Sequence, residues 1–183
     1  AGFAEQADDP ERAIDLHLAL GQAYELDALD DRRAAEAYQK AEARLAARAD
    51  QRRLEEVFRA LDRIYERLGD LASLGDLLEK RVSAEESGEG GAALADPLYR
   101  LATLRLSRPD TQAEGLGFLA RAQAAEPRPD QAEAALRAAL LADAHSVPVL
   151  RALEQLARST GRERTLIDVL VLLWERSAPS ASG

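Results

Sequence analysis

Residues whose types and spacing could perform chemistry are few in this chain. The sequence contains no cysteine, which excludes disulfides and thiolate metal sites, and two histidines, His17 and His145. His17 falls between two helical patterns, where a structural role is expected. His145 falls in a turn before a helix start, where we expect it to be solvated. A glycine-rich phosphate loop, a His-Glu-x-x-His motif and a nucleophile elbow do not occur. We therefore predict that the protein is not an enzyme and binds no cofactor and no metal.

Acidic residues gather at Asp8–Asp9, in the turn from Asp27 to Asp31, and at Glu85–Glu86. Each cluster falls at an expected helix end or loop. A carboxylate there caps the free N–H groups of a first helical turn and interacts favourably with the helix dipole. A hard cation would need oxygen ligands that converge from several segments. We interpret these acids as capping groups.

The charge balance argues against several classes of partner. The chain has 24 Lys and Arg against 33 Asp and Glu, a net charge of −9 at pH 7. Nucleic-acid binders usually gather basic residues on one face, so we expect no nucleic-acid partner. Every apolar run falls short of the ~18 residues of a spanning helix, and the start does not resemble a signal peptide, so we expect no membrane insertion and a cytoplasmic location. The Arg- and Ala-rich composition is typical of a GC-rich bacterial genome.

Helices must position whatever residues act. Hydrophobic residues make up 46% of the chain but aromatics only 4%, because Ala and Leu dominate, and both are strong helix formers. No strand-like run occurs, so the chain is predicted to be all-α. Capping signals predict about nine helices joined by short turns, in a single domain over residues 9–177, with disordered ends at 1–8 and 178–183. The signals are Asp9-Pro10, Asp50, Gly69-Asp70, Asp96-Pro97, Ser146 and Gly161. The glycine-rich stretch at 87–91 could mark a break within that domain.

The helical pattern repeats along the chain. The stretch from Phe58 reads against the stretch from Leu150, 92 residues later, without a gap. Both carry Arg-Ala-Leu, then a turn glycine, then Asp. That offset spans five helices, an odd number, so the alternation of first and second helices is predicted to break near Pro127–Pro129. The helix expected at 130–142 fits no full repeat.

Residues 13–41 form the clearest unit, a helix, a turn and a second helix, with small residues such as Gly21 where the two backbones must approach. This pattern resembles the tetratricopeptide repeat family, which has a period of about 34 residues and places Leu, a small residue and Tyr on the first helix and Ala, an aromatic and Ala on the second. One extra residue lies in the first turn. The resemblance implies a right-handed α-solenoid of antiparallel helix pairs. Its packing positions are Leu20, Gly21, Tyr24, Ala34, Tyr38, Ala41, Leu61, Tyr65, Leu101, Ala102, Leu119, Ala122, Leu153 and Leu170.

The resemblance also implies that the first helix of each pair lines a concave groove for a peptide. The main groove candidates are Gln22, Glu25, Arg59, Arg63, Glu66, Tyr99, Thr103, Arg151 and Gln155, with Asp15, Leu18, Glu56 and Arg158 beside them. Arginine suits carboxylates because its planar fork binds them bidentately. The simpler interpretation is that these residues form solvated helix faces.

We therefore expect a non-catalytic module that docks a partner protein or peptide. Two alternatives stay open. The chain could be a structural repeat protein that self-assembles end to end into a homo-oligomer through Trp174 and Leu173. It could also be a regulatory domain cut from a larger protein.

Overall fold

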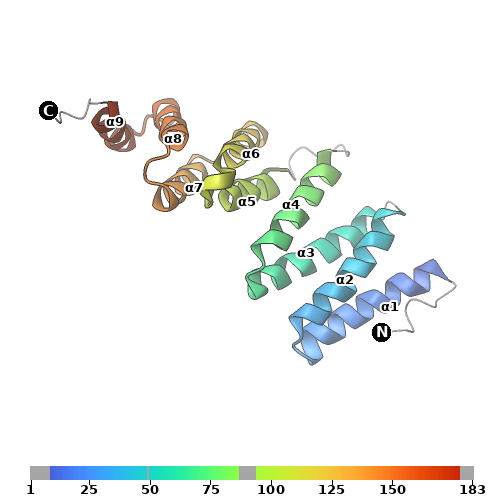
Figure 1. Cartoon of the computed structure of the whole chain (residues 1–183). Coiled ribbons are helices and arrows are strands. Elements are labelled where there is room, and N and C mark those ends of the chain that lie inside the picture. Colours follow the sequence, from blue (N-terminus) through green and yellow to red (C-terminus); the bar gives the residue numbers. More distant parts are fainter. Residues whose placement is uncertain (1–8, 49, 87–93, 178–183) are drawn as a thin grey trace. The chain divides into compact units, whose positions relative to one another are not determined.

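The computed structural model describes residues 9–48, 50–86 and 94–177, and these ranges contain nine α-helices and no strand (Figure 1). The predicted all-α class and helix number are therefore confirmed for the described part of the chain. The chain divides into two compact units, Ala1–Leu77 and Leu78–Gly183. The expected loop at 87–91 and the two chain ends lie outside the described residues.

The first unit holds three whole helices and the start of a fourth. Helix α1 spans Pro10–Gln22 and continues as a π-helical turn, Ala23–Asp27. Helix α2 spans Asp31–Ala46, α3 spans Gln51–Leu68, and α4 runs from Leu71 to Glu86. Helix α2 packs against both α1 and α3.

Local capping explains where these helices begin and end. The carboxylates of Asp30, Asp50 and Asp70 each accept a hydrogen bond from the backbone N–H three residues later, at 3.1, 3.2 and 3.1 Å. Asp9 caps α1 through the backbone N–H of Glu11. Gly69 ends α3 with φ of +64°, in the left-handed region that glycine adopts without strain. These contacts satisfy N–H and C=O groups that a helix end leaves free.

Helices α1 and α2 approach closely at a glycine, as the sequence predicts. A Cβ atom added to Gly21 would lie 2.8 Å from the ring of Tyr38, closer than van der Waals contact allows. Ala34 and Ala41, on the same face of α2 as Tyr38, are fully buried. Tyr24, by contrast, is only half-buried, and the guanidinium of Arg33 lies 5.8 Å from its ring centre.

The second unit begins within α4 and holds five further helices. They are α5 (Ala95–Leu106), α6 (Gln112–Ala125, preceded by a 3₁₀ turn at Pro109–Thr111), α7 (Pro129–Ala142), α8 (Val147–Thr160) and α9 (Glu163–Ser177). Gly161 ends α8 with φ of +70°, as predicted. Ser146 takes the N-cap position of α8, although its side chain makes no capping hydrogen bond.

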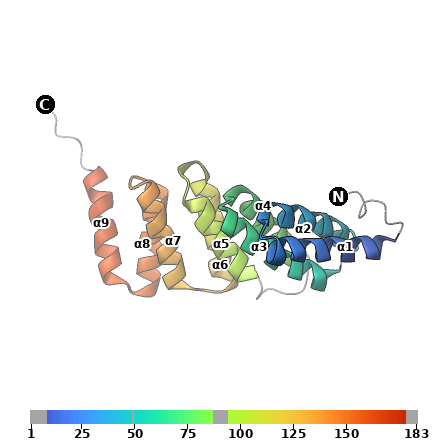
Figure 2. The same ribbon diagram turned by 90° about the horizontal axis from the view of Figure 1, so that it is seen from below.

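Helix α7 packs against α5 and α8 (Figures 1 and 2). It is the helix that fits no full repeat in the sequence. Helix α6 in turn contacts α8, so α5 and α7 are neighbours and α6 and α8 are neighbours. Helices α5 and α6 therefore each contact the helix two places later in the chain. The predicted break near Pro127–Pro129 stays a prediction, as does the assignment of α8, whose sequence matches that of α3, to the first helices.

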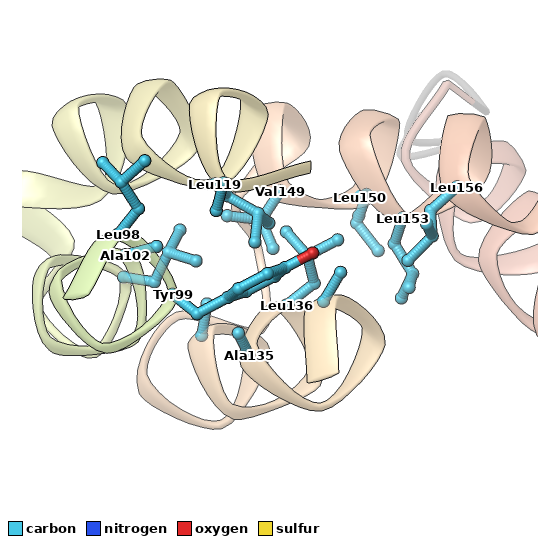
Figure 3. Packing of buried hydrophobic residues seen from close by; sticks show 14 of the residues in the cluster. Leu98, Tyr99, Ala102, Leu119, Ala135, Leu136, Val149, Leu150, Leu153 and Leu156 are labelled. Carbon is cyan, nitrogen blue, oxygen red and sulfur yellow. The ribbon is translucent and has the colours of Figure 1, made fainter. Parts of the chain in front are cut away.

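Side chains from α4 to α9 share one apolar cluster in this unit (Figure 3). The predicted packing residues Ala102, Leu119, Ala122 and Leu153 all belong to it. Leu170 differs from its prediction, since it is 39% exposed while its neighbour Val169 is 2% exposed and joins the cluster. On α9, Val169 rather than Leu170 is therefore the position packed in the core of this unit.

Candidate functional site

The predicted groove residue Glu25 lies inside the first unit and ties three elements together. It belongs to the π-helical turn after α1 and is buried. Its carboxylate accepts a hydrogen bond from the Tyr38 hydroxyl at 3.2 Å, and the guanidinium groups of Arg63 and Arg67 donate to it at 3.3 and 3.2 Å. The sequence predicts Glu25 and Arg63 for an open groove, but Glu25 is buried and Arg63 is one of its partners. Glu25 is therefore not open to a partner, whereas the side chain of Arg63 is 57% exposed and its groove role stays a prediction.

The residues around Glu25 shift the pKa values of two neighbouring side chains, Tyr38 and Asp31. Burial raises the pKa of Tyr38 to about 12, and the negative charge of Glu25 adds to that rise. Arg67 also donates hydrogen bonds to both carboxylate oxygens of Asp31, and these lower the pKa of Asp31. Tyr38 therefore remains a neutral hydrogen-bond donor at physiological pH, and Asp31 remains an anion.

Three other predicted groove residues of the first unit, Gln22, Arg59 and Glu66, lie exposed. The guanidinium of Arg59 pairs with Glu55 one helical turn earlier, at 3.2 Å. Exposed pairs of this kind contribute little to stability, so Arg59 can exchange partners readily. The structure leaves these three positions on the surface.

Tyr99 is predicted for the groove, but it is fully buried in the second unit, where its ring lies beside Leu136 (Figure 3). Its hydroxyl donates to the backbone oxygen of Glu126 at 3.0 Å and accepts from the backbone N–H of Arg128 at 2.8 Å. Tyr99 therefore fastens the α6–α7 connection to α5. Thr103, one turn later, is half-buried and donates its hydroxyl hydrogen to the Tyr99 carbonyl.

A groove of about 430 Å³ does open in the second unit, between α6 and α8. Four α6 positions line it, Leu116, Leu119, Ala120 and Gln123, and four α8 positions face them, Ala152, Gln155, Leu156 and Ser159. Both sets have the spacing i, i+3, i+4, i+7, which places each set on one helix face. Leu136 of α7 closes the floor. The groove is therefore a trough lined by leucine and alanine side chains together with the amide and hydroxyl groups of Gln123, Gln155 and Ser159.

Each of the two helices contributes a small residue to the lining of the groove. Ala120 is exposed and Ala152 is half-buried, and a larger side chain at either position would fill the trough. The buried Leu119, Leu136 and Leu156 belong to the apolar cluster, so the floor is a continuation of the core. A partner side chain in the trough would exchange water for an apolar surface.

A positively charged face adjoins the groove on α8. The guanidinium groups of Arg151 and Arg158 both donate to the carboxylate of Glu154, at 2.9 and 2.7 Å. The arginine side chains are 66% and 60% exposed, while that of Glu154 is 11% exposed. These hydrogen bonds, the one from Arg151 first, lower the pKa of Glu154. Two exposed cations over one buried anion leave this face with an excess of positive charge in a chain that is negative overall.

Arg151 and Gln155 are thus brought together by the structure, but with new neighbours. Their place in the repeat predicts them for the same surface as Tyr99 and Thr103 on α5. Because α8 lies beside α6, they instead border the α6–α8 groove. The α6 half of the groove was not anticipated. Its signal was present as Leu116, Leu119, Ala120 and Gln123 at helical spacing, but nothing in the sequence pairs that face with α8.

Among the described residues there is neither a candidate metal centre nor a candidate membrane span. No group of three or more His, Asp or Glu among them could hold a metal ion. None of the helices in the described ranges is both long enough and apolar enough to span a bilayer. His17 is buried between helices of the first unit, whereas His145 is exposed in the α7–α8 turn.

The described residues form an all-helical fold in which neighbouring helices pack on one another, and the second unit adds a groove between α6 and α8 with a cationic edge. A scan against protein-family models found no match for this chain, and a search of curated proteins found none either.

Proposed function

We propose that this protein is a non-catalytic interaction module that holds an amphipathic, acidic helix of a partner protein in the α6–α8 groove. The observation that carries the proposal is the trough beside Arg151 and Arg158. The alternation of α5–α7 and α6–α8 supports the further proposal of a TPR-like, right-handed α-solenoid, a fold class that binds peptides along its helices.

The shape and chemistry of the groove select the partner. A trough of about 430 Å³ holds a few side chains and no whole domain. An amphipathic helix fits because it presents apolar side chains at i, i+3 or i+4, and i+7, the spacing that also lines the trough. Gln123 and Gln155 supply donors and acceptors at the edge. Carboxylates beside the apolar stripe would meet Arg151 and Arg158, whose planar groups bind carboxylates bidentately.

The partner chemistry can be tested without knowing the natural partner. A display library of helix-forming random peptides would be selected on the full chain, and the affinity of enriched peptides measured by titration calorimetry. We expect enriched peptides to carry an apolar stripe flanked by Asp or Glu. Changing these acids to amides should weaken binding roughly ten-fold, and added salt should weaken it as well.

Two results would argue against the proposal. Enrichment of peptides without acidic residues would remove the role assigned to Arg151 and Arg158. The failure of any peptide to enrich above a blank surface would mean that the groove does not dock helices.

A further inference from the structure

We propose that the outer face of α9 binds the same face of a second copy of this chain, as an antiparallel helix pair around a two-fold axis. This inference is independent of the α6–α8 groove, because the two surfaces share no residue. It starts from the burial pattern of the last helix.

Helix α9 carries apolar residues on two opposite faces. Thr165 and Val169 are buried, and Leu173 packs beside them on the shared apolar cluster. The opposite face presents Ile167, Val171 and Trp174, which are 61%, 49% and 70% exposed. Their spacing of four and three residues places them on a single stripe. Exposed apolar stripes of this kind usually mark a contact with another protein.

The surroundings of α9 leave this stripe accessible. Within the second unit, α9 contacts α8, and Figures 1 and 2 show α9 at the end of the row of helices that starts at α5. The side of α9 turned away from α8 carries the stripe. A second helix could therefore lie along α9 without displacing any described element of this unit.

The charges on the stripe indicate which occupant fits. Arg164 lies on this face near the N-terminal end of α9, and Glu175 lies on it near the C-terminal end. They are eleven positions apart, just over three helical turns, so they share the face with Ile167 and Val171. Arg164 and Glu175 lie on one flank of the stripe, so two copies that run antiparallel can pair these charges, while Glu163 lies on the other flank at the N-terminal end. Arg164 of each copy then meets Glu175 of the other.

The same register also aligns the apolar residues. The midpoint between Arg164 and Glu175 and the midpoint between Ile167 and Trp174 differ by one residue, about 1.5 Å along the helix. A single two-fold axis near Leu170 therefore pairs Arg164 with Glu175 and Ile167 with Trp174. Asp168 falls level with Val171 and Leu172 of the second copy, away from its acids. Such an isologous contact closes on itself as a dimer and does not grow into a filament.

Charge exchange tests the register directly. Because the pairing is symmetric, each substitution alters two contacts per dimer. In the variant Arg164→Glu, a carboxylate would face Glu175 of the other copy at both ends of the interface. In the variant Glu175→Arg, two guanidinium groups would face each other in the same way. We expect either single variant to weaken dimerisation of the full chain by about ten-fold, and the double variant Arg164→Glu/Glu175→Arg to restore it. Sedimentation equilibrium from micromolar to millimolar chain measures each constant, and Arg12→Glu on α1 controls for the change in net charge.

Trp174 provides an independent readout, since it is the single tryptophan of the sequence. Its emission should move to shorter wavelength as the dimer forms, in step with sedimentation. Val171→Glu should abolish both signals. A chain that stays monomeric up to millimolar concentration would overturn the proposal and assign the stripe to a different partner. A dimer that keeps its affinity in both single charge variants, or leaves the Trp174 emission unchanged, would overturn it as well.

Discussion

Carboxylates link several helices of this protein in addition to the apolar core, and Glu133 illustrates the chemistry. Its side chain on α7 is 13% exposed and accepts hydrogen bonds from Arg137 at 2.8 Å, from Thr165 on α9 at 2.8 Å, and from Arg162 just before α9. These contacts, led by the one from Arg162, lower the pKa of Glu133 from 4.5 to about 2. Glu133 thus links α7 to the start of α9 as an anion.

This shift predicts the pH dependence of stability. A carboxylate whose pKa falls on folding stabilises the folded state fully above its unfolded pKa and loses that contribution as pH drops toward its folded pKa. For Glu133 the loss should run from about pH 4.5 down to about pH 2. The variant Glu133→Gln should be less stable at pH 7, and its deficit should shrink across that window. Urea unfolding at several pH values measures this, and a deficit that stays constant down to pH 2 would contradict the assigned role.

Single residues also show where prediction from sequence fails. Glu25 and Tyr99 have the polar atoms of a binding residue and the spacing of a groove position. The structure uses these polar atoms internally, with Glu25 bound to Arg63 and Arg67 and Tyr99 bound to the backbone at Glu126 and Arg128. Helical periodicity indicates which face a residue occupies but does not reveal what lies opposite that face.

At the scale of elements, glycine sets the distance between paired helices. A Cβ atom on Gly115 of α6 would lie 2.7 Å from the backbone nitrogen of Leu106 on α5, whereas one on Gly117 would meet nothing within 4 Å. The same substitution should therefore have opposite effects two residues apart in the same helix.

We expect Gly115→Ala to destabilise the protein by about 1–3 kcal/mol, because the contact is with backbone and α5 must move. Gly117→Ala should instead stabilise it by roughly 0.5–1 kcal/mol, since alanine favours the helix without a clash. Chemical unfolding of both variants beside wild type tests the pair. Equal effects of the two substitutions would show that α5 and α6 are not packed at this distance.

Helix boundaries were predictable from sequence because their causes are local. Asp50 and Asp70 cap the helices that follow them, and Gly69 and Gly161 take the left-handed conformation that ends a helix. The place of α7 beside α5, and hence of α8 beside α6, was not predictable in the same way. Those contacts join residues far apart in the chain. The sequence match between α3 and α8 instead predicts α8 as the first helix of a pair.

At the scale of the whole molecule, both proposed interfaces fall in the second unit. The whole chain has a net negative charge, but the α8 face of this unit carries an excess of positive charge. The excess charge at Arg151 and Arg158 over Glu154 would attract an acidic partner, while the net charge of −9 would repel acidic proteins that lack a matching apolar stripe. Specificity would then come from the groove and its edge acting together. The central claim is that the α6–α8 groove docks the partner.

The most direct measurement is the affinity of a library-selected peptide for two matched variants of the full chain. Ala120→Arg fills the trough from an exposed position on α6, and Ala134→Arg places the same side chain on the exposed face of α7, away from the groove. Arginine is nearly as good a helix former as alanine, so circular dichroism should show both variants folded. We predict that Ala120→Arg loses peptide binding while Ala134→Arg keeps the wild-type affinity. Equal affinity of both variants and wild type would contradict the account and place the docking site elsewhere on the molecule.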